Sequence, residues 1–526
     1  MNNNMKTPIS KDLFTFANTS EKIHDRKFED KPIGYFKDAW IRFRKSRASV
    51  VAAIIIVLIV LYSVLCPLLI TTHDNSFMVP NYAKKPARVT WLRDSIGIMD
   101  GGMSDTKNES EILRLAAIGI GATPTAMNDT SYATSLETNY QPLLSVDYAG
   151  IEINAKKQEV KKYDIRVDKY LEVGFIYEQI PQSELPNILA WQEETGIQVL
   201  YPLIAANEYN SDASNPNAWY KHARTLGNPV RVDASGKSHA IAFSDDMVLE
   251  DNYKRDADGN LVFYEYTGGG SLETAEYKIR VLYYNYYQYL YGFEPNYIMG
   301  TEAQGYDMAL RIADGIQLSM LIAVAVCVIN FILGAMYGAV EGYYGGTLDL
   351  ILERVSDILS GVPFIVVATL FQLHLAKKVG PIVCLLFAYI LTGWIGTAYR
   401  VRTQFYRFKN QEYVMAARTL GASDQRIIWK HIFPNTLGTI ITSSALAIPG
   451  AIMSESMLSY LGIIKLGGTT GSSLGTLLSD AQKVWTTAPH VLLYPAIFIS
   501  LLMICFNLFG NGLRDAFNPS LRGVEE

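Results

Sequence analysis

Six long, uncharged apolar runs constrain this chain more than any other feature of its sequence. Their apolar residues form continuous stretches and are not spaced with the period of an amphipathic helix or a strand. Each stretch is long enough for the roughly twenty apolar residues that a transmembrane helix needs. We therefore predict an α-helical membrane protein with six transmembrane helices, at residues 48–70, 316–340, 358–376, 379–399, 436–454 and 491–511.

Clusters of basic residues predict how these helices are oriented. Cytoplasmic loops carry an excess of Lys and Arg. One cluster precedes the first run and another fills the segment after the fourth, so we expect both to be cytoplasmic. Six spans then place both termini in the cytoplasm of a cell-membrane protein. The clusters are Lys37, Arg42, Arg44, Lys45 and Arg47, and Arg400, Arg402, Arg407, Lys409, Arg418, Arg426 and Lys430.

The segment between the first and second runs is far too long for a loop, and on this topology it lies outside the cell. It carries roughly a dozen excess acids, whereas the rest of the chain is basic. Ser183 is expected to cap a helix that ends at Gly196, and strand-like runs surround this helix. We predict an inserted extracellular α+β domain at 102–295. The strand-like runs are 163–177, 197–204, 239–243, 261–266 and 277–287, and residues 119–135 are expected to form a loop.

The remaining expected boundaries follow from the runs. They are a cytoplasmic amino-terminal tail (1–47), the first helix (48–70), a membrane core with the other five helices (300–515), a cytoplasmic loop (402–435) and a cytoplasmic carboxyl-terminal tail (516–526).

Neither a catalytic nor a metal site can be argued from the sequence. The tail of a phosphate-binding loop, Gly236-Lys237-Ser238, lacks the first glycine of that motif and is not followed by a helical pattern, so a hairpin turn is favoured. The histidines are scattered, without a spacing typical of metal ligands. Any energy for active transport is therefore expected to come from another subunit.

Polar or small residues within the apolar runs are further candidates. Gly334, Gly338 and Gly342 line one face of the second run, which allows either a partner helix or a helix of this chain to approach closely. Glu455 is a charged residue near the end of the fifth run, where it serves either a gate or pathway, or a structural hydrogen bond. A dense tyrosine run at 283–291 is interpreted as an aromatic belt at the membrane interface.

The polar segment 412–435, EYVMAARTLGASDQRIIWKHIFPN, lies between two apolar runs. Ala416 and Ala417 leave a helix face small enough to lie flat on a partner, and Gly421 breaks the helix at low steric cost. Pro434 marks where a membrane helix restarts. We predict a helix-turn-helix knob. Ala-rich helices ending in Gly also occur in soluble proteins, but there no apolar span follows at once.

With these residues assembled, the chain resembles the C-type permease subunit of the oligopeptide and dipeptide ABC importers. The resemblance covers residues 35–105 and 296–523, and the inserted domain departs from it. The matching motifs are PARVTWL (86–92) with GIMDG (97–101), GTEAQGYD (300–307), GYYGG (342–346) with Asp349, the segment 412–435, SESMLSYLG (454–462) and NGLRD (511–515).

The resemblance implies the type I ABC importer permease fold and a heteromeric importer. The expected partners are a B-type permease subunit, two cytoplasmic ATP-binding subunits, an extracellular peptide-binding protein and membrane lipid. ATP and Mg would bind the partner ATPase subunits, and no cofactor is expected on this chain. Residues 412–435 would be the loop that couples to the ATPases, through Glu412, Ala416, Ala417, Gly421, Asp424 and Pro434.

Two other functions remain open. Permeases for nickel or another small solute share these motifs, and a membrane receptor with an extracellular sensing domain would have a similar layout. Nucleic-acid binding is not supported, because the basic residues belong to the membrane part and the inserted domain is acidic.

Overall fold

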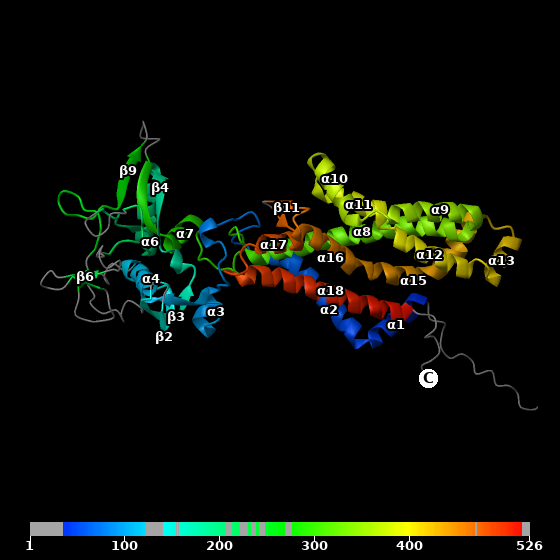
Figure 1. The fold of residues 1–526 in the computed structure, drawn as a ribbon, viewed down its shortest axis with the longest axis horizontal. Helices are drawn as coiled ribbons and strands as arrows, with labels where there is room; N and C mark the ends of the chain where they lie inside the picture. Colours follow the sequence, from blue (N-terminus) through cyan, green and yellow to red (C-terminus); the bar gives the residue numbers. More distant parts are fainter. Residues whose placement is uncertain are drawn as a thin grey trace, which may run out of the picture.

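The computed structural model of the chain describes residues 35–122, 140–153, 155, 157–206, 213–220, 230–232, 238–240, 248–249, 251–268, 276–468 and 471–517. In this part the molecule is elongated, with long helices at one end and most of the strands at the other (Figure 1). The chain enters the strand-rich part after the first long helix and returns to begin the second.

By length and composition, the described residues contain five helical stretches that could each cross a membrane, or six if one bent helix pair counts as a span. The five are α2 (Arg47–Leu69), α8 (Met308–Tyr344), Pro381–Phe408, Asp424–Tyr460 and α18 (Pro489–Phe517). Pro381–Phe408 consists of α11 (Pro381–Thr392) and α12 (Ile395–Phe408), and Asp424–Tyr460 runs from α14 (Asp424–Arg426) through α15 (Phe433–Ala445) to α16 (Ala447–Tyr460).

The third expected span, 358–376, is not one straight helix. The helices α9 (Gly346–Ser360) and α10 (Phe364–Val379) meet at a bend of 70°. Pro363 is the N-cap residue of α10. Proline lacks a backbone donor and disfavours helical geometry in the residue before it, so the helix breaks here. The expected number of six spans is thus not confirmed.

The helix α8 is central to the helical part, since it contacts α2, α11, α12, α15, α16, α17 (Leu474–Ala481) and α18. It begins well before the expected position 316, because the Asp307 carboxylate caps it by accepting a hydrogen bond from the Ala309 backbone N–H at 2.7 Å. At the other end of the bundle, the short helix α1 (Tyr35–Lys45) packs Phe43 against Ala516 of α18.

Two antiparallel segments form a stem between the helical and strand-rich parts. The Lys84 backbone N–H donates to the Glu302 carbonyl at 3.0 Å, and the Arg88 and Tyr297 backbones bond each other at 2.9 and 2.7 Å. Gly300 has φ +74°, and a Cβ there would lie 2.3 Å from the Lys85 carbonyl oxygen. Only glycine allows this approach, which explains why a glycine opens the motif at 300–307. Short elements flank the stem: η2 (Pro80–Tyr82) and α3 (Thr90–Ile96).

The described residues of the strand-rich part form three antiparallel sheets of three or four strands. In the first, β1 and β2 flank β3, with Gly102 opposite Asp168 and Leu143 opposite Val167. In the second, β10 pairs with β4, β5 and β9, and in the third β6 pairs with β7 and β8. The strands are β1 (Gly102–Asn108), β2 (Leu143–Ile153), β3 (Glu159–Asp168), β4 (Phe175–Pro181), β5 (Leu200–Tyr201), β6 (Val230–Val232), β7 (Ser238–Ala240), β8 (Val248–Leu249), β9 (Tyr264–Gly268) and β10 (Glu276–Leu282).

Among the residues that the structure describes here, three α-helices contribute to the core: α4 (Glu109–Ala122), α6 (Leu185–Thr195) and α7 (Tyr283–Tyr291). The core also includes Val79, Tyr82 and Tyr297, which lie outside the residues 102–295 assigned to the domain from the sequence. The stem is therefore packed into the strand-rich part.

Several expected elements of this part differ in the structure. Ser183 does not cap the helix, because Glu184 is the N-cap residue and Pro186 occupies the first turn, where its fixed φ is favourable. Gly196 ends the helix as predicted, with φ +71°. The expected strand 163–177 is two strands, separated by the 3-10 turn η4 (Leu171–Val173). Residues 119–122 of the expected loop belong to α4, and 123–135 lie outside the described residues.

The tyrosine run is not a membrane belt, so this interpretation was wrong. Tyr283, Tyr284, Tyr286 and Tyr287 are at most 8% exposed in the core of the strand-rich part. Their spacing includes i, i+3 and i+4, which places them on one helix face. The expected strand 277–287 accordingly stops at Leu282. Around the Gly-Lys-Ser segment, β6 and β7 pair with Val232 opposite Ser238, as a hairpin requires, while residues 233–237 lie outside the described part.

Candidate functional site

The polar segment 412–435 folds into a knob, which we define as α13 (Glu412–Thr419), a turn, α14 and the π-helical stretch Ile427–Ile432. Gly421 lies in the turn with φ +81°, a conformation that residues with a Cβ rarely adopt. The Ser423 hydroxyl then caps α14 by accepting from the Arg426 backbone N–H at 3.4 Å. The predicted helix-turn-helix shape and the helix break at Gly421 are confirmed.

Pro434 does not restart a membrane helix, because the helix is already running from Asp424. The proline lies in the first turn of α15, directly after the π-helical stretch. A proline within a helix removes one backbone donor and clashes with the carbonyl four residues earlier. The wider π-helical turn accommodates this defect, and it joins the knob to the apolar helix without a break.

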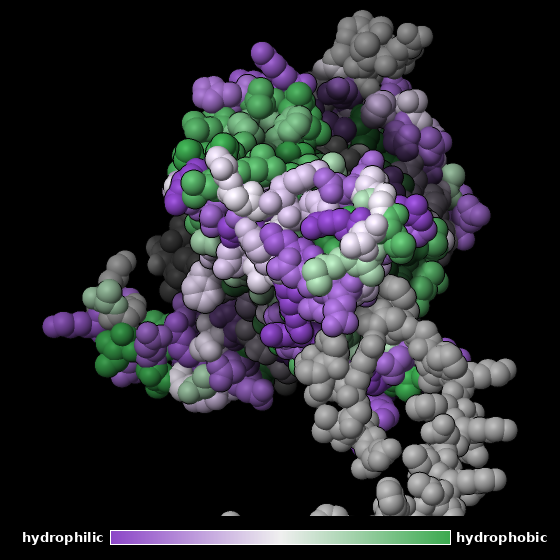
Figure 2. All heavy atoms as spheres, turned by 90° about the vertical axis from the view of Figure 1, so that its right-hand side faces the viewer, coloured by the Kyte–Doolittle hydropathy of each residue, from purple (hydrophilic) through white to green (hydrophobic). Residues whose placement is uncertain are grey.

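The knob lies at the end of the molecule farthest from the strand-rich part (Figure 1). Val414 and Ile427 are buried against α8 and α12, whereas Leu420 is 88% exposed and Met415 is 51% exposed. Glu412, Ala416 and Asp424 are also exposed and Ala417 is half-buried. Viewed onto this end of the molecule, Figure 2 shows exposed hydrophobic atoms among hydrophilic ones. Uncovered large apolar side chains of this kind are typical of a protein contact surface.

Tyr343, which the sequence did not single out as a candidate, connects α8 to the knob. The Tyr343 hydroxyl donates to Asp424 Oδ1 at 2.5 Å and accepts from Arg418 Nη2 at 3.3 Å. Tyr343 belongs to the matched GYYGG motif, but a motif does not reveal a partner about eighty residues away, which only the fold brings close.

Next to this contact, Arg402 of α12 holds the start of α9. Its Nε and Nη2 bond the Asp349 carboxylate at 2.6 and 2.8 Å, and its Nη2 lies 3.3 Å from Glu353 Oε2. The Tyr406 hydroxyl donates to the same Asp349 carboxylate. The bidentate geometry fixes α9 against α12 at the knob end of the bundle.

Gly334, Gly338 and Gly342 of α8 pack against α12 of the same chain. A Cβ on Gly338 would lie 2.2 Å from the Ala398 carbonyl oxygen, and a Cβ on Gly334 would lie 2.6 Å from Thr397 Cβ. Of the two possibilities that the sequence left open, these contacts are those of packing within the chain.

Glu455 is 1% exposed within α16. Its carboxylate accepts hydrogen bonds from Ser319 of α8 at 2.9 Å and from Ser459 at 3.0 Å. The bond from Ser319 connects α16 to α8, so the geometry is that of the structural hydrogen bond, one of the two alternatives that the sequence left open. The glycines lie on α8, and Glu455 and the knob contact this helix at Ser319 and Tyr343. These two positions are about 36 Å apart along the helix at a rise of 1.5 Å per residue, so the structure does not bring Glu455 and the knob together.

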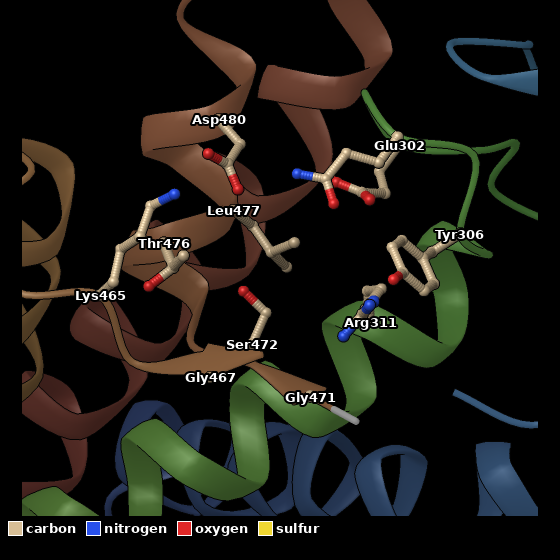
Figure 3. A pocket seen from close by; sticks show the side chains of 11 residues that line it. Glu302, Tyr306, Arg311, Lys465, Gly467, Gly471, Ser472, Thr476, Leu477 and Asp480 are labelled. Atoms are coloured by element: carbon tan, nitrogen blue, oxygen red, sulfur yellow. The ribbon is translucent and has the colours of Figure 1, made fainter. Parts of the chain in front are cut away.

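A pocket of about 220 Å³ opens at the other end of α8, near the stem. Figure 3 shows the side chains of Glu302, Tyr306, Arg311, Lys465 and Asp480 around it. The hairpin of β11 (Gly467–Gly468) and β12 (Gly471–Ser472) and the helix α17 line the opposite wall. The pocket therefore carries both signs of charge.

Glu302 and Arg311 are deeply placed in this pocket, at 4% and 3% exposed. Burial raises the pKa of Glu302 to about 7, with Asp480 adding to the rise and Arg311 opposing it. The Arg311 guanidinium carbon lies 3.7 Å from the centroid of the Tyr306 ring. Such a pocket suits the binding of small polar or zwitterionic groups. Among the described residues, no group of three or more His, Cys, Asp or Glu side chains could hold a metal ion.

Two family models match the chain. One, described as the inner membrane component of a binding-protein-dependent transport system, matches residues 330–523. The other, described as the N-terminal TM domain of oligopeptide transport permease C, matches residues 34–86. The knob, Glu455 and all three packed glycines lie within the first match, and the strand-rich part lies in neither.

The chain is also similar to curated permease proteins of oligopeptide and dipeptide transport systems. The oligopeptide transport system permease protein OppC of Bacillus subtilis is 40% identical over 225 residues, which cover 42% of this chain and 72% of that protein. The dipeptide transport system permease protein DppC of the same organism is 39% identical, covering 42% and 68%. OppC of Haemophilus influenzae is 40% identical, covering 44% and 72%.

Among solved structures, the MetNI methionine ABC transporter in inward-facing conformations matches 39% of this chain and 94% of its own, at 14% identity and a TM-score of 0.32. This likeness is too weak to support an argument.

Proposed function

Because this chain belongs to the oligopeptide and dipeptide permease subunits of binding-protein-dependent ABC importers, we propose that it forms half of a membrane pathway for oligopeptides or dipeptides. The main support is that the chain is 40% identical in sequence to permeases of this kind over more than two thirds of their length. The alternatives of a nickel or other small-solute permease and of a sensing receptor are not favoured by these relatives.

We propose that the knob end of the molecule is cytoplasmic and the strand-rich part extracellular. The basic residues before and at the start of α2 and the basic residues of α12 and the knob support this orientation. The helices α1 and α13 lie at one end of the bundle and the strand-rich part at the other, which supports it too (Figure 1). Both termini are then cytoplasmic if the bent pair α9 and α10 counts as a span.

The knob is proposed to dock into a cytoplasmic ATPase subunit. Its outer face combines Leu420 and Met415 with the exposed Ala416, the half-buried Ala417 and the charged Glu412. A rigid helical projection of this kind transmits a displacement because it is packed against the bundle on its inner side. ATP and Mg would bind the two ATPase subunits, and this chain would hydrolyse nothing itself.

A B-type permease is proposed to complete the pathway, and an extracellular peptide-binding protein to deliver cargo. The mixed-charge pocket supports the entry of peptides at the stem end, because a short peptide carries a cationic and an anionic terminus. The strand-rich part is proposed to engage the binding protein, since the stem holds it beside this entrance.

The complex itself provides the test. The tagged chain is purified from membranes of its source, co-purified subunits and ligands are identified by mass spectrometry, and the complex is reconstituted into liposomes. We expect a second permease and ATPase subunits, and ATP-dependent uptake of labelled di- or oligopeptides in the presence of the binding protein. Accumulation of Ni²⁺ without peptide uptake, or purification without an ATPase, would contradict the proposal.

A further inference from the structure

One continuous helix connects the two candidate sites. The helix α8 has 37 residues, which corresponds to about 55 Å at a rise of 1.5 Å per residue. Arg311, in its first turn, lines the pocket near the stem. Tyr343, in its last turn, contacts the knob. The helix therefore spans the whole distance between the surface proposed to meet the ATPase and the proposed entrance for cargo.

At its knob end, α8 meets both helices of the knob through a single side chain. The Tyr343 hydroxyl lies between Asp424, which begins α14, and Arg418, near the end of α13. The ring is 7% exposed and belongs to an apolar cluster with Val414 of α13 and Ile427. A displacement of either helix of the knob would therefore change a hydrogen bond of the same hydroxyl.

The end of α8 is also fixed to α12, so that it moves with its neighbours as a unit. The Lys409 ammonium donates to the Gly342 carbonyl oxygen at 3.0 Å. A Cβ on Gly342 would lie 2.6 Å from Phe405 Cβ, so the two helices are in close contact here. Close-packed helices transmit displacement because their interface cannot deform gradually.

At its stem end, α8 is tied to α16 and to α17, and α17 lines the pocket. Ser319 donates to the Glu455 carboxylate of α16 at 2.9 Å. A Cβ on Gly315 would lie 3.0 Å from the Leu474 backbone nitrogen at the start of α17. Movement of α8 would accordingly shift both Arg311 and the opposite wall of the pocket.

We propose that Tyr343 is the positioning residue that couples the knob to α8, and that its hydroxyl transmits the state of the ATPases to the pocket near the stem. This inference rests on the proposed function and assigns the transmitting group within it. The hydroxyl matters because it is bonded to a carboxylate and faces a guanidinium, and hydrogen bonds to charged groups are stronger and more directional than neutral ones.

The test uses Tyr343→Phe, which removes the hydroxyl and keeps the buried ring. The matched control is Tyr344→Phe, at a neighbouring tyrosine that is 53% exposed. The complete complex is reconstituted in liposomes with loaded binding protein, and the number of peptides transported per ATP hydrolysed is measured. We expect this ratio to fall about tenfold in Tyr343→Phe, as loss of a charged hydrogen bond permits, and to stay at the wild-type value in Tyr344→Phe.

The ratio separates transmission from stability. If Tyr343 were only structural, less complex would assemble, transport and hydrolysis would fall together, and an unchanged ratio would overturn the inference. A second measurement does not need transport: hydrogen exchange of residues 302–311 in the complex with and without ATP. We expect the nucleotide-dependent change there to be lost in Tyr343→Phe. If the nucleotide-dependent change persists in Tyr343→Phe, Tyr343 does not transmit the state of the ATPases. If the change is lost in Tyr343→Phe but the wild-type complex transports no peptide, only the proposed cargo is contradicted.

Discussion

Glu302 is a carboxyl group that the fold keeps away from water, and this has a measurable consequence. Burial raises its pKa from the ordinary value of 4.5 to about 7. The native protein then binds more protons than the unfolded chain between these values, so stability falls as pH rises from about 4.5 to about 7. The full loss is about 3 kcal/mol. Neutralising this side chain should remove the loss.

We therefore predict that Glu302→Gln raises the thermal unfolding midpoint at pH 8 and raises it much less at pH 5, where Glu302 is protonated in the native protein and resembles Gln. Midpoints of the purified complex across this range measure the difference. Glu193→Gln, at an exposed position on α6, is the control and should show no such difference. An effect of Glu302→Gln that is the same at both pH values would contradict the assignment.

Gly421 offers a second test at the residue scale. A Cβ there would meet no atom within 4 Å, so a substitution acts through the backbone, at a cost of about 1–2 kcal/mol for a residue that avoids positive φ. We predict that Gly421→Val reaches normal membrane levels but loses peptide uptake and cargo-stimulated ATP hydrolysis. Gly421→Asn, which tolerates this conformation, should keep most of both. Equal loss in the two variants would show that the turn conformation is not the cause.

At the scale of elements, the contact between α8 and α12 is built on glycine. Gly338→Ala would place a Cβ 2.2 Å from the Ala398 carbonyl oxygen, and the helices would have to separate at a cost of about 1–3 kcal/mol. We predict a lower thermal unfolding midpoint of the complex. Gly396→Ala lies on α12 itself, where the nearest atom to the new Cβ is Arg400 Nη2 at 3.7 Å, and it should unfold as the wild type does. A midpoint unchanged by Gly338→Ala would indicate a looser contact.

The sequence predicted those elements that depend on residues close to one another in the chain. The knob, its glycine break, the end of α6 at Gly196 and the apolar helices follow from residues that act within a turn or two of themselves. The π-helical turn before Pro434 was not predicted, because the sequence shows a defect but not how the neighbouring helix absorbs it. The tyrosines of α7 were misplaced, because composition suggested a membrane surface while their spacing indicated a packed helix face.

The parts of the candidate site that could not be predicted depend on contacts between residues far apart in the sequence. Every residue proposed to couple to the ATPases came from a motif, yet Tyr343, which bonds to Asp424, was not among those proposed. The same holds for the pocket, where Glu302 and Asp480 meet only after the chain has crossed the helical bundle several times. The sequence identified which residues are polar in apolar surroundings, and the fold decides which of them meet.

At the scale of the whole molecule, the stem decides how the strand-rich part can be removed. Backbone hydrogen bonds join the segment that enters the strand-rich part to the segment that leaves it. They begin at the pair Val79 and Gly305 and end at the pair Arg88 and Tyr297. Removing 102–295 would leave Asp100 without Arg166, whose Nη2 lies 2.7 Å from it, and α3 without its neighbours. Removing 90–295 and closing the gap with a short Gly-Ser linker keeps the stem bonds and ends beside a bridged pair, Arg88 and Tyr297.

We predict that the 90–295 deletion assembles with its partners, because the residues that pack α8 against α2, α12, α16 and α18 lie elsewhere, and that it assembles better than the 102–295 deletion. If the strand-rich part engages the binding protein, peptide uptake by the 90–295 deletion should need a higher concentration of that protein to reach half its maximum. The measurement is uptake against binding-protein concentration for the intact and deleted complexes. An unchanged curve would remove the docking role, and failure of the 90–295 deletion to assemble would make the strand-rich part a structural component of the permease.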